Sequence, residues 1–155
     1  MLRGMYTVRV TPEGRLVAEV SGRLSTEEAL RLISQGFALA EAGAITDLLV
    51  DVRGVERGPG QWLVLGALLA SRMADPMRLA VVAGTAQEPA ARRILRYSGL
   101  RNRATVVMDE PAAARWFAER FREGAREGSR ARRRAAVERE RAGEAAAEEF
   151  RPKAG

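Results

Sequence analysis

The sequence predicts a single α/β domain in which helices cover a mixed β-sheet, followed by a charged C-terminal tail. Three observations predict it: two alternating segments open the chain as a hairpin, three later apolar segments alternate with helical patterns, and large apolar residues almost vanish after Phe121. The 155 residues are 46% hydrophobic, which is enough for one core. We therefore expect a domain over residues 1–121 and a tail over residues 122–155 that is a frayed helix or disordered.

The first elements follow from alternation and from a capping motif. Residues 5–11 and 15–20 alternate apolar and polar side chains on either side of the turn sequence TPEG, a pattern typical of a β-hairpin. Ser25 and Glu28 have the spacing of a capping box, so a helix begins there. Gly36 inside this helix costs about 1 kcal/mol, which predicts that it compensates by a close approach to the sheet.

Strands and helices alternate after this point. Residues 45–52 are almost continuously apolar, which indicates a strand buried on both faces in the middle of a parallel sheet. A glycine-rich loop then leads into a second helix. The remaining predicted elements are a strand over 78–83, a helix with Pro89 in its first turn and Gly99 at its end, a strand over 105–108, and a helix capped by Asp109. The predicted order of elements is ββαβαβαβα.

The composition excludes several classes of function. The chain has no cysteine and no histidine, so disulfides, thiolate metal sites and histidine-based catalysis are excluded, and we expect no metal, no cofactor and no enzymatic activity. The net charge of +6 is spread evenly, with 16 Lys/Arg against 13 Asp/Glu in residues 1–121 and 10 against 7 in residues 122–155. Nucleic acid is therefore an unlikely partner. No secretory leader pattern and no apolar run of roughly 20 residues is visible, so we expect no membrane span and a cytoplasmic location.

The loop that enters the second helix is the first candidate site. Gly58 and Gly60 leave backbone N–H groups available for an anion, with positive charge supplied by Arg53 and Arg57. The alternative, favoured by the absence of a phosphate-loop lysine, is a loop that needs glycine for its dihedral angles. Asp51 has no second catalytic group near it in sequence, so we expect it to cap the loop.

The second helix carries more apolar side chains than one sheet can cover. One stripe consists of Trp62, Leu65, Leu69 and Met73. Val64 and Leu68 lie elsewhere on the cylinder, and either a partner or the tail and last helix of the same chain must cover them. The third helix adds a basic patch, which is typical of a solvated helix face and equally suits an acidic partner: Arg92, Arg93 and Arg96.

Four segments carry a resemblance to a known family: LLVDVRGVERGPGQWLVLGALLA from Leu48, RLAVVAG from Arg78, ARRILRYSGL from Ala91 and MDEPAAARWF from Met108. In their order and spacing the chain resembles the STAS domains, the SpoIIAA-like anti-sigma-factor antagonists. The resemblance implies a non-catalytic regulatory module that binds a protein of the kinase or sigma-regulator type. Phosphorylated members of the family carry an Asp-Ser-Ser-Gly-like element at the second helix. Residues 56–61 hold no hydroxyl group, so we expect that phosphoacceptor to be missing.

The segments RLAVVAG and AAARWF also resemble SpoIIAA-like proteins grouped with Sec14-type lipid carriers. That resemblance implies an alternative function, the carriage of a small apolar or lipid ligand between helix and sheet. For the regulatory module we expect docking of a partner, or self-association, through the second and third helices. The candidate partner-binding residues are Arg57, Gly58, Gly60, Val64, Leu68, Arg92 and Arg96; the candidate anion-binding residues are Arg53, Gly58 and Gly60.

Overall fold

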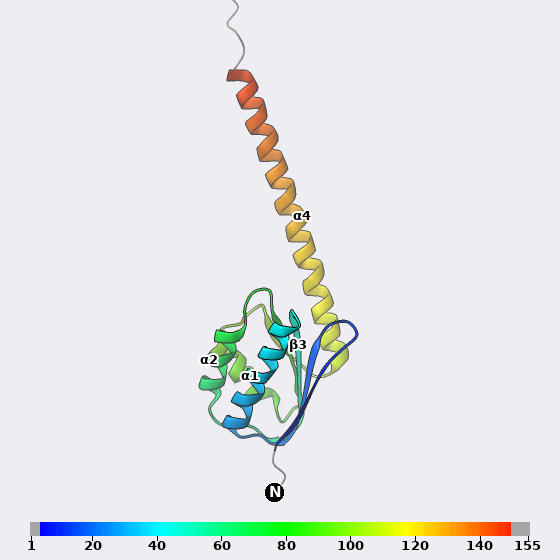
Figure 1. Cartoon of the computed structure of the whole chain (residues 1–155), viewed down its shortest axis with the longest axis vertical. Coiled ribbons are helices and arrows are strands. Elements are labelled where there is room, and N and C mark those ends of the chain that lie inside the picture. Colours follow the sequence, from blue (N-terminus) through cyan, green and yellow to red (C-terminus); the bar gives the residue numbers. More distant parts are fainter. Residues whose placement is uncertain (1–3, 150–155) are drawn as a thin grey trace, which may run out of the picture. The chain divides into compact units, whose positions relative to one another are not determined.

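A five-stranded mixed sheet forms the framework of the computed structural model, which describes residues 4–149 (Figure 1). The strands lie side by side in chain order, and β1 pairs antiparallel with β2 while the other pairs are parallel. The strands are β1 (Met5–Val10), β2 (Leu16–Arg23), β3 (Asp47–Arg57), β4 (Arg78–Val82) and β5 (Ala104–Val107). The helices of this described part are α1 (Thr26–Ala42), α2 (Trp62–Arg72), α3 (Glu88–Ser98) and α4 (Glu110–Glu149). The predicted α/β class and the order ββαβαβαβα are therefore confirmed.

The caps expected from the sequence are present. The Ser25 hydroxyl accepts a hydrogen bond from the Glu28 backbone N–H at 3.1 Å, and the Glu28 carboxylate accepts one from the Ser25 N–H at 2.8 Å. Gly99 ends α3 in the left-handed conformation, with φ of 69°. The Asp109 carboxylate accepts from the backbone N–H of Ala112 at 2.8 Å at the start of α4. Local side-chain chemistry thus sets the start of α1 and α4 and the end of α3.

Strand β3 is longer than predicted. It was expected to end at Val52, but it continues to Arg57 by pairing with the second half of β2, where Ser21 lies opposite Gly54 and Arg23 opposite Arg57. A Cβ atom on Gly54 would lie 3.0 Å from the Cβ of Ser21, so glycine permits this close pairing. The loop before α2 is therefore shorter than the sequence suggested.

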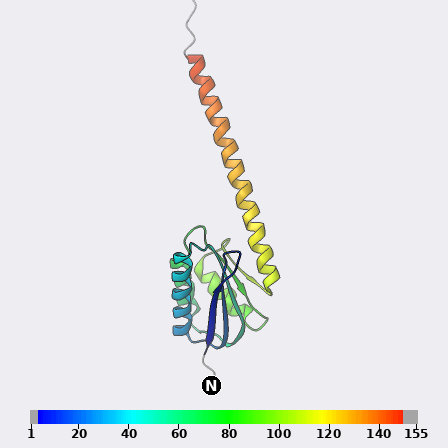
Figure 2. The same cartoon turned by 45° about the vertical axis from the view of Figure 1, so that its right-hand side comes forward.

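One face of the sheet carries the main core together with α1, α2 and α3. Its side chains form rows across neighbouring strands, such as Leu16, Leu48 and Leu79, which are 4–5% exposed. They belong to the same core cluster as Phe37 of α1, Leu69 of α2 and Ala91 of α3. Figure 2 shows α1 standing against the sheet. Burial of these apolar side chains is the main favourable contribution to folding.

Helices α2 and α3 pack closely at Gly66. A Cβ atom at this position would lie 2.7 Å from the carbonyl oxygen of Ile94 and 2.7 Å from the Cβ of Tyr97. Only glycine leaves room for such an approach. Gly36 of α1, by contrast, does not make the close approach to the sheet that we predicted, because an added Cβ would meet only the Leu16 side chain at 3.9 Å.

The charged C-terminal region is part of one uninterrupted helix, α4, up to Glu149 (Figure 1). Gly124, Gly128 and Gly143, which were expected to break the pattern, lie within this helix, since the alanine-rich sequence with Arg and Glu three or four residues apart favours it. Fraying of the tail stays a prediction. Residues up to Arg115 form one compact unit and those from Trp116 onward a second, so the boundary at residue 121 stays a prediction. The tail beyond residue 149 lies outside the described residues.

Among the helices that residues 4–149 form, none combines the length and apolar character needed to cross a bilayer.

Candidate functional site

The loop before α2 is short and carries no charged cap. Helix α2 starts after Gln61, whose side chain makes no capping hydrogen bond, and its first turn holds no acidic residue. Gly58 and Gly60, which were expected to bind an anion or a partner, lie in the loop before Gln61 and are exposed. Neither has a positive φ in the described chain, so their conformation does not require glycine.

The Arg53 side chain forms ion pairs with two acidic residues, Asp51 and Glu110. Its backbone N–H and its Nε each donate to Asp51 Oδ1 at 3.0 Å, and its Nη2 lies 2.6 Å from Asp51 Oδ2 and 3.8 Å from the Glu110 carboxylate. Partial burial acts to raise the pKa of Asp51, but the hydrogen bonds and the charge of Arg53 outweigh it and hold that pKa below its ordinary value. Asp51 thus accepts a hydrogen bond from the backbone N–H of Arg53, which is the local capping role expected for it. Because Arg53 is paired with Asp51 and lies near Glu110, less of its charge is left for an anion, and its contribution to an anion site stays a prediction.

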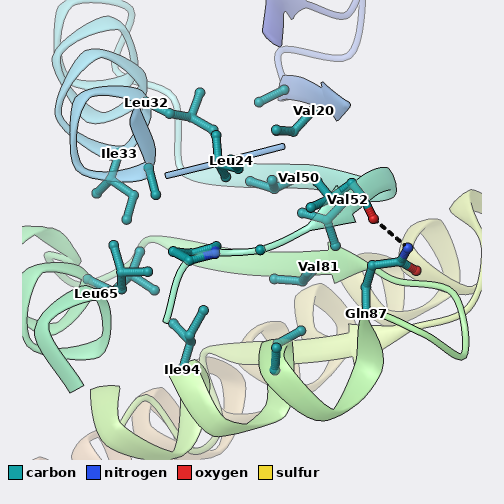
Figure 3. Close-up of a pocket in the computed structure, with 18 of the residues that line it drawn as sticks. Val20, Leu24, Leu32, Ile33, Val50, Val52, Leu65, Val81, Gln87 and Ile94 are labelled. Atoms are coloured by element: carbon teal, nitrogen blue, oxygen red, sulfur yellow. Dashed lines mark hydrogen bonds between the residues drawn. The ribbon is translucent and has the colours of Figure 1, made fainter. Parts of the chain in front are cut away.

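Gln87 joins the end of β3 to the start of α3. Its side-chain Nε2 donates to the carbonyl oxygen of Val55 at 2.8 Å, the bond drawn in Figure 3, and to that of Arg53 at 3.2 Å. The sequence analysis missed this residue, since nothing in the local pattern of Gln87 identifies carbonyl groups more than 30 residues away as its acceptors. Both amide hydrogens of Gln87 are used by these two bonds, so this side chain has no free donor.

Helix α2 has a buried side and an exposed apolar side. Of the predicted buried stripe, Leu65, Leu69 and Met73 are at most 7% exposed, and Trp62 is only partly buried. On the outer side, Leu63 is 63% exposed and Val64 is 44% exposed. Leu68, the other member of the predicted pair, is partly buried, and Leu63, which the sequence analysis did not single out, is the more exposed neighbour of Val64. A role for Leu68 in binding stays a prediction.

The three arginines expected as a patch on α3 have different surroundings. Arg92 pairs with Glu88 one turn earlier, at 2.7 Å. The Arg93 guanidinium lies 4.6 Å from the centre of the Trp62 ring, a cation–π contact that joins α3 to α2. Arg96 is exposed and makes no ion pair with another described residue. Tyr97, which the sequence analysis did not single out, is half-exposed beside Gly66.

A cavity of about 240 Å³ lies between the sheet and helices α1, α2 and α3. Figure 3 shows the side chains around it, among them Leu32, Ile33, Val50, Val52, Leu65, Val81 and Ile94. Within the described chain its lining includes only two polar side chains, Glu56 and Gln87. Glu56, Gly58 and Ala86 are exposed, so this end of the cavity, at the carboxyl end of β3, opens to water.

Comparison with solved structures identifies the same fold. The crystal structure of an anti-sigma factor antagonist from Mycobacterium paratuberculosis is similar with a TM-score of 0.52 and 24% identity, over 72% of this chain and 91% of that chain. An uncharacterized DUF3478-family protein with a SpoIIAA-like fold from Shewanella loihica PV-4 has 19% identity and a TM-score of 0.46, over 73% of this chain and 92% of that one. No family model and no curated protein matches the sequence. The chain therefore has the STAS/SpoIIAA-like fold that its motifs predicted.

Proposed function

We propose that the chain is a non-catalytic regulatory module that binds a protein of the kinase or sigma-regulator type through a docking face on α2 and α3. We define the docking face as Leu63, Val64, Arg93, Arg96 and Tyr97. The observation that carries the proposal is the exposure of Leu63 and Val64, 63% and 44%, on a helix whose opposite side lies in the core. Adjacent large apolar side chains left in water are typical of a surface that another protein covers.

The charge of the docking face favours an acidic partner. Arg93 lies over the ring of Trp62, the residue before Leu63, the exposed Arg96 follows on the same helix α3, and Arg57 lies at the end of β3. Two copies of the chain meeting through this face would bring arginines together, which costs free energy. We therefore favour a different, acidic protein over self-association. Gly58 and Gly60 beside Arg57 are proposed to contact the same partner through their backbone.

Phosphorylation of the loop before α2 does not control this binding in our proposal. Residues 52–61 contain no serine, threonine or tyrosine, so the loop offers no hydroxyl group to a kinase. Partner binding then depends on the concentration of the partner, or on a signal that acts elsewhere in the chain.

The test compares three immobilised proteins. A Leu63→Glu/Val64→Glu double variant places two carboxylates on the docking face, and Leu39→Glu makes the same kind of change at a half-exposed leucine of α1. Proteins retained from an extract of the source cells are identified, produced pure, and titrated calorimetrically at two salt concentrations. We expect wild type and Leu39→Glu to bind equally, more weakly at high salt, and the double variant to lose binding at least about tenfold. Equal binding by all three proteins would refute the docking face.

The cavity favours a second function, the binding of an apolar small molecule. A space of about 240 Å³ with an almost wholly apolar lining, open to water at one end, is unusual in a domain of this size, since protein interiors pack with few voids larger than a water molecule. Native mass spectrometry of the freshly purified full chain tests this function directly. An added mass that denaturation releases supports a carried ligand.

A further inference from the structure

The volume of the cavity limits the size of its ligand. An engineered protein cavity of about 150 Å³ stays dry and binds benzene, which has six carbon atoms. In the same proportion, a cavity of about 240 Å³ holds roughly ten non-hydrogen atoms. The ligand is therefore smaller than a phospholipid and larger than a solvent molecule.

The lining indicates an extended ligand. Leu48, Val50 and Val52 are successive inward-facing positions of β3, and all three line the cavity. At about 3.3 Å per residue, these positions span roughly 13 Å along the strand. These positions give a single aliphatic chain a continuous apolar track along β3. The chain would lie along β3 with its head at the open end beside Glu56.

The polar atoms at the open end accept hydrogen bonds rather than donate them. The Glu56 side chain is exposed there, and its carboxylate offers only acceptor oxygens when ionised. The Gln87 amide already donates to two backbone carbonyls, which leaves its Oε1 as an acceptor. A carboxylate head would meet the charge of Glu56 and find no free side-chain donor among the described cavity-lining residues, because the Gln87 amide is already used.

We propose that the cavity binds a single-chain aliphatic compound of about ten carbons whose head group donates a hydrogen bond and carries no negative charge, such as a primary alcohol. This inference rests on the second proposed function, apolar ligand binding. Gly36 is the position at which a substitution can block the cavity. It lines the cavity, and an added Cβ atom there meets only Leu16, at 3.9 Å. A larger side chain at residue 36 has room to enter the space that the ligand would take.

The experiment titrates the full-length chain with 1-decanol and, separately, with sodium decanoate at pH 8, following binding by calorimetry and by the thermal midpoint. Gly36→Leu fills the cavity, and Gly143→Leu is the same substitution in a helix away from the cavity lining. We expect decanol to bind wild type and Gly143→Leu and to raise their midpoints, with no effect on Gly36→Leu. Decanoate is expected to bind wild type at least about tenfold more weakly than decanol.

Two further variants sharpen the result. Ala90→Leu fills the cavity from α3 and replaces Gly36→Leu if circular dichroism shows that protein to be unfolded. Glu56→Gln removes the negative charge at the open end, so decanoate binding should strengthen several-fold while decanol binding changes little. Decanoate binding as tight as decanol binding would overturn the head-group inference and leave apolar ligand binding standing. Failure of wild type to bind either probe would overturn both.

Discussion

Arg53 holds the carboxylate of Asp51 through its own backbone N–H and through its guanidinium, with donor–acceptor distances of 2.6–3.2 Å. The two residues lie two positions apart on β3, so their side chains project from the same face of the sheet. The Asp51 side chain is only 13% exposed, whereas that of Arg53 is 44% exposed. The pair therefore satisfies a mostly buried carboxylate at the point where β3 continues beyond its parallel partner β4.

Asp51→Asn is expected to lower the free energy of unfolding at pH 7 by about 1 kcal/mol or less, because water screens the exposed guanidinium. The folded-state pKa of Asp51 lies below its ordinary value of 3.8, so the stabilisation is present above that value and is lost as the pH falls through the folded pKa. Urea unfolding of both proteins at pH 7 and pH 3 measures this. The difference should shrink at pH 3, and a difference that grows there would contradict the assigned pKa direction.

Gly66→Ala is expected to cost about 1–3 kcal/mol, because the added methyl group would lie 2.7 Å from the Ile94 carbonyl oxygen and the Tyr97 Cβ. Gly36→Ala is the matched control in another helix. It should stabilise the domain by about 0.5–1 kcal/mol, since its methyl group enters open space and alanine is the better helix former. Chemical denaturation measures both changes. If the two variants had equal stability, the close packing of α2 on α3 would be refuted.

Local signals made much of this fold predictable. The capping box of Ser25 and Glu28, the left-handed Gly99 and the cap at Asp109 all depend on residues within four positions of each other, and each is where the pattern placed it. The extension of β3 to Arg57 was not predictable in this way. It depends on pairing with β2, which lies more than 30 residues earlier in the chain.

The candidate site was predictable only in part for the same reason. Periodicity separated the buried side of α2 from Val64, but it did not indicate that Leu63 is exposed and Leu68 partly buried, which depends on the packing of the whole helix in the domain. The partners of Arg53 and Gln87 also became visible only in three dimensions. The cavity is a space between four elements, and no segment of the sequence encodes it by itself.

A charge at three positions of α2 should have graded effects on stability. Val64→Glu is expected to change the thermal midpoint by no more than a few degrees, because this side chain is 44% exposed. Leu68→Glu should lower the midpoint further, since the Leu68 side chain is partly buried. Leu65→Glu should unfold the domain because Leu65 is 2% exposed. Melting followed by circular dichroism gives the order. An order in which Val64→Glu is the most damaging would show that the proposed docking face belongs to the core.

Truncation after Arg122 is expected to leave the thermal midpoint of the domain unchanged within about 2 °C, which corresponds to less than 1 kcal/mol for a domain of this size. The described side chains between Arg126 and Ala146 are exposed, apart from the half-exposed Gly128, and the largest apolar one, Val137, is 48% exposed. Such residues remove little apolar surface from water, so their loss should cost helix content but little domain stability. Circular dichroism at two protein concentrations measures both quantities. A midpoint that drops by many degrees in the truncated chain at both concentrations would show that this part of α4 contributes to the folded domain, and a drop only at high concentration would show that it joins copies of the chain.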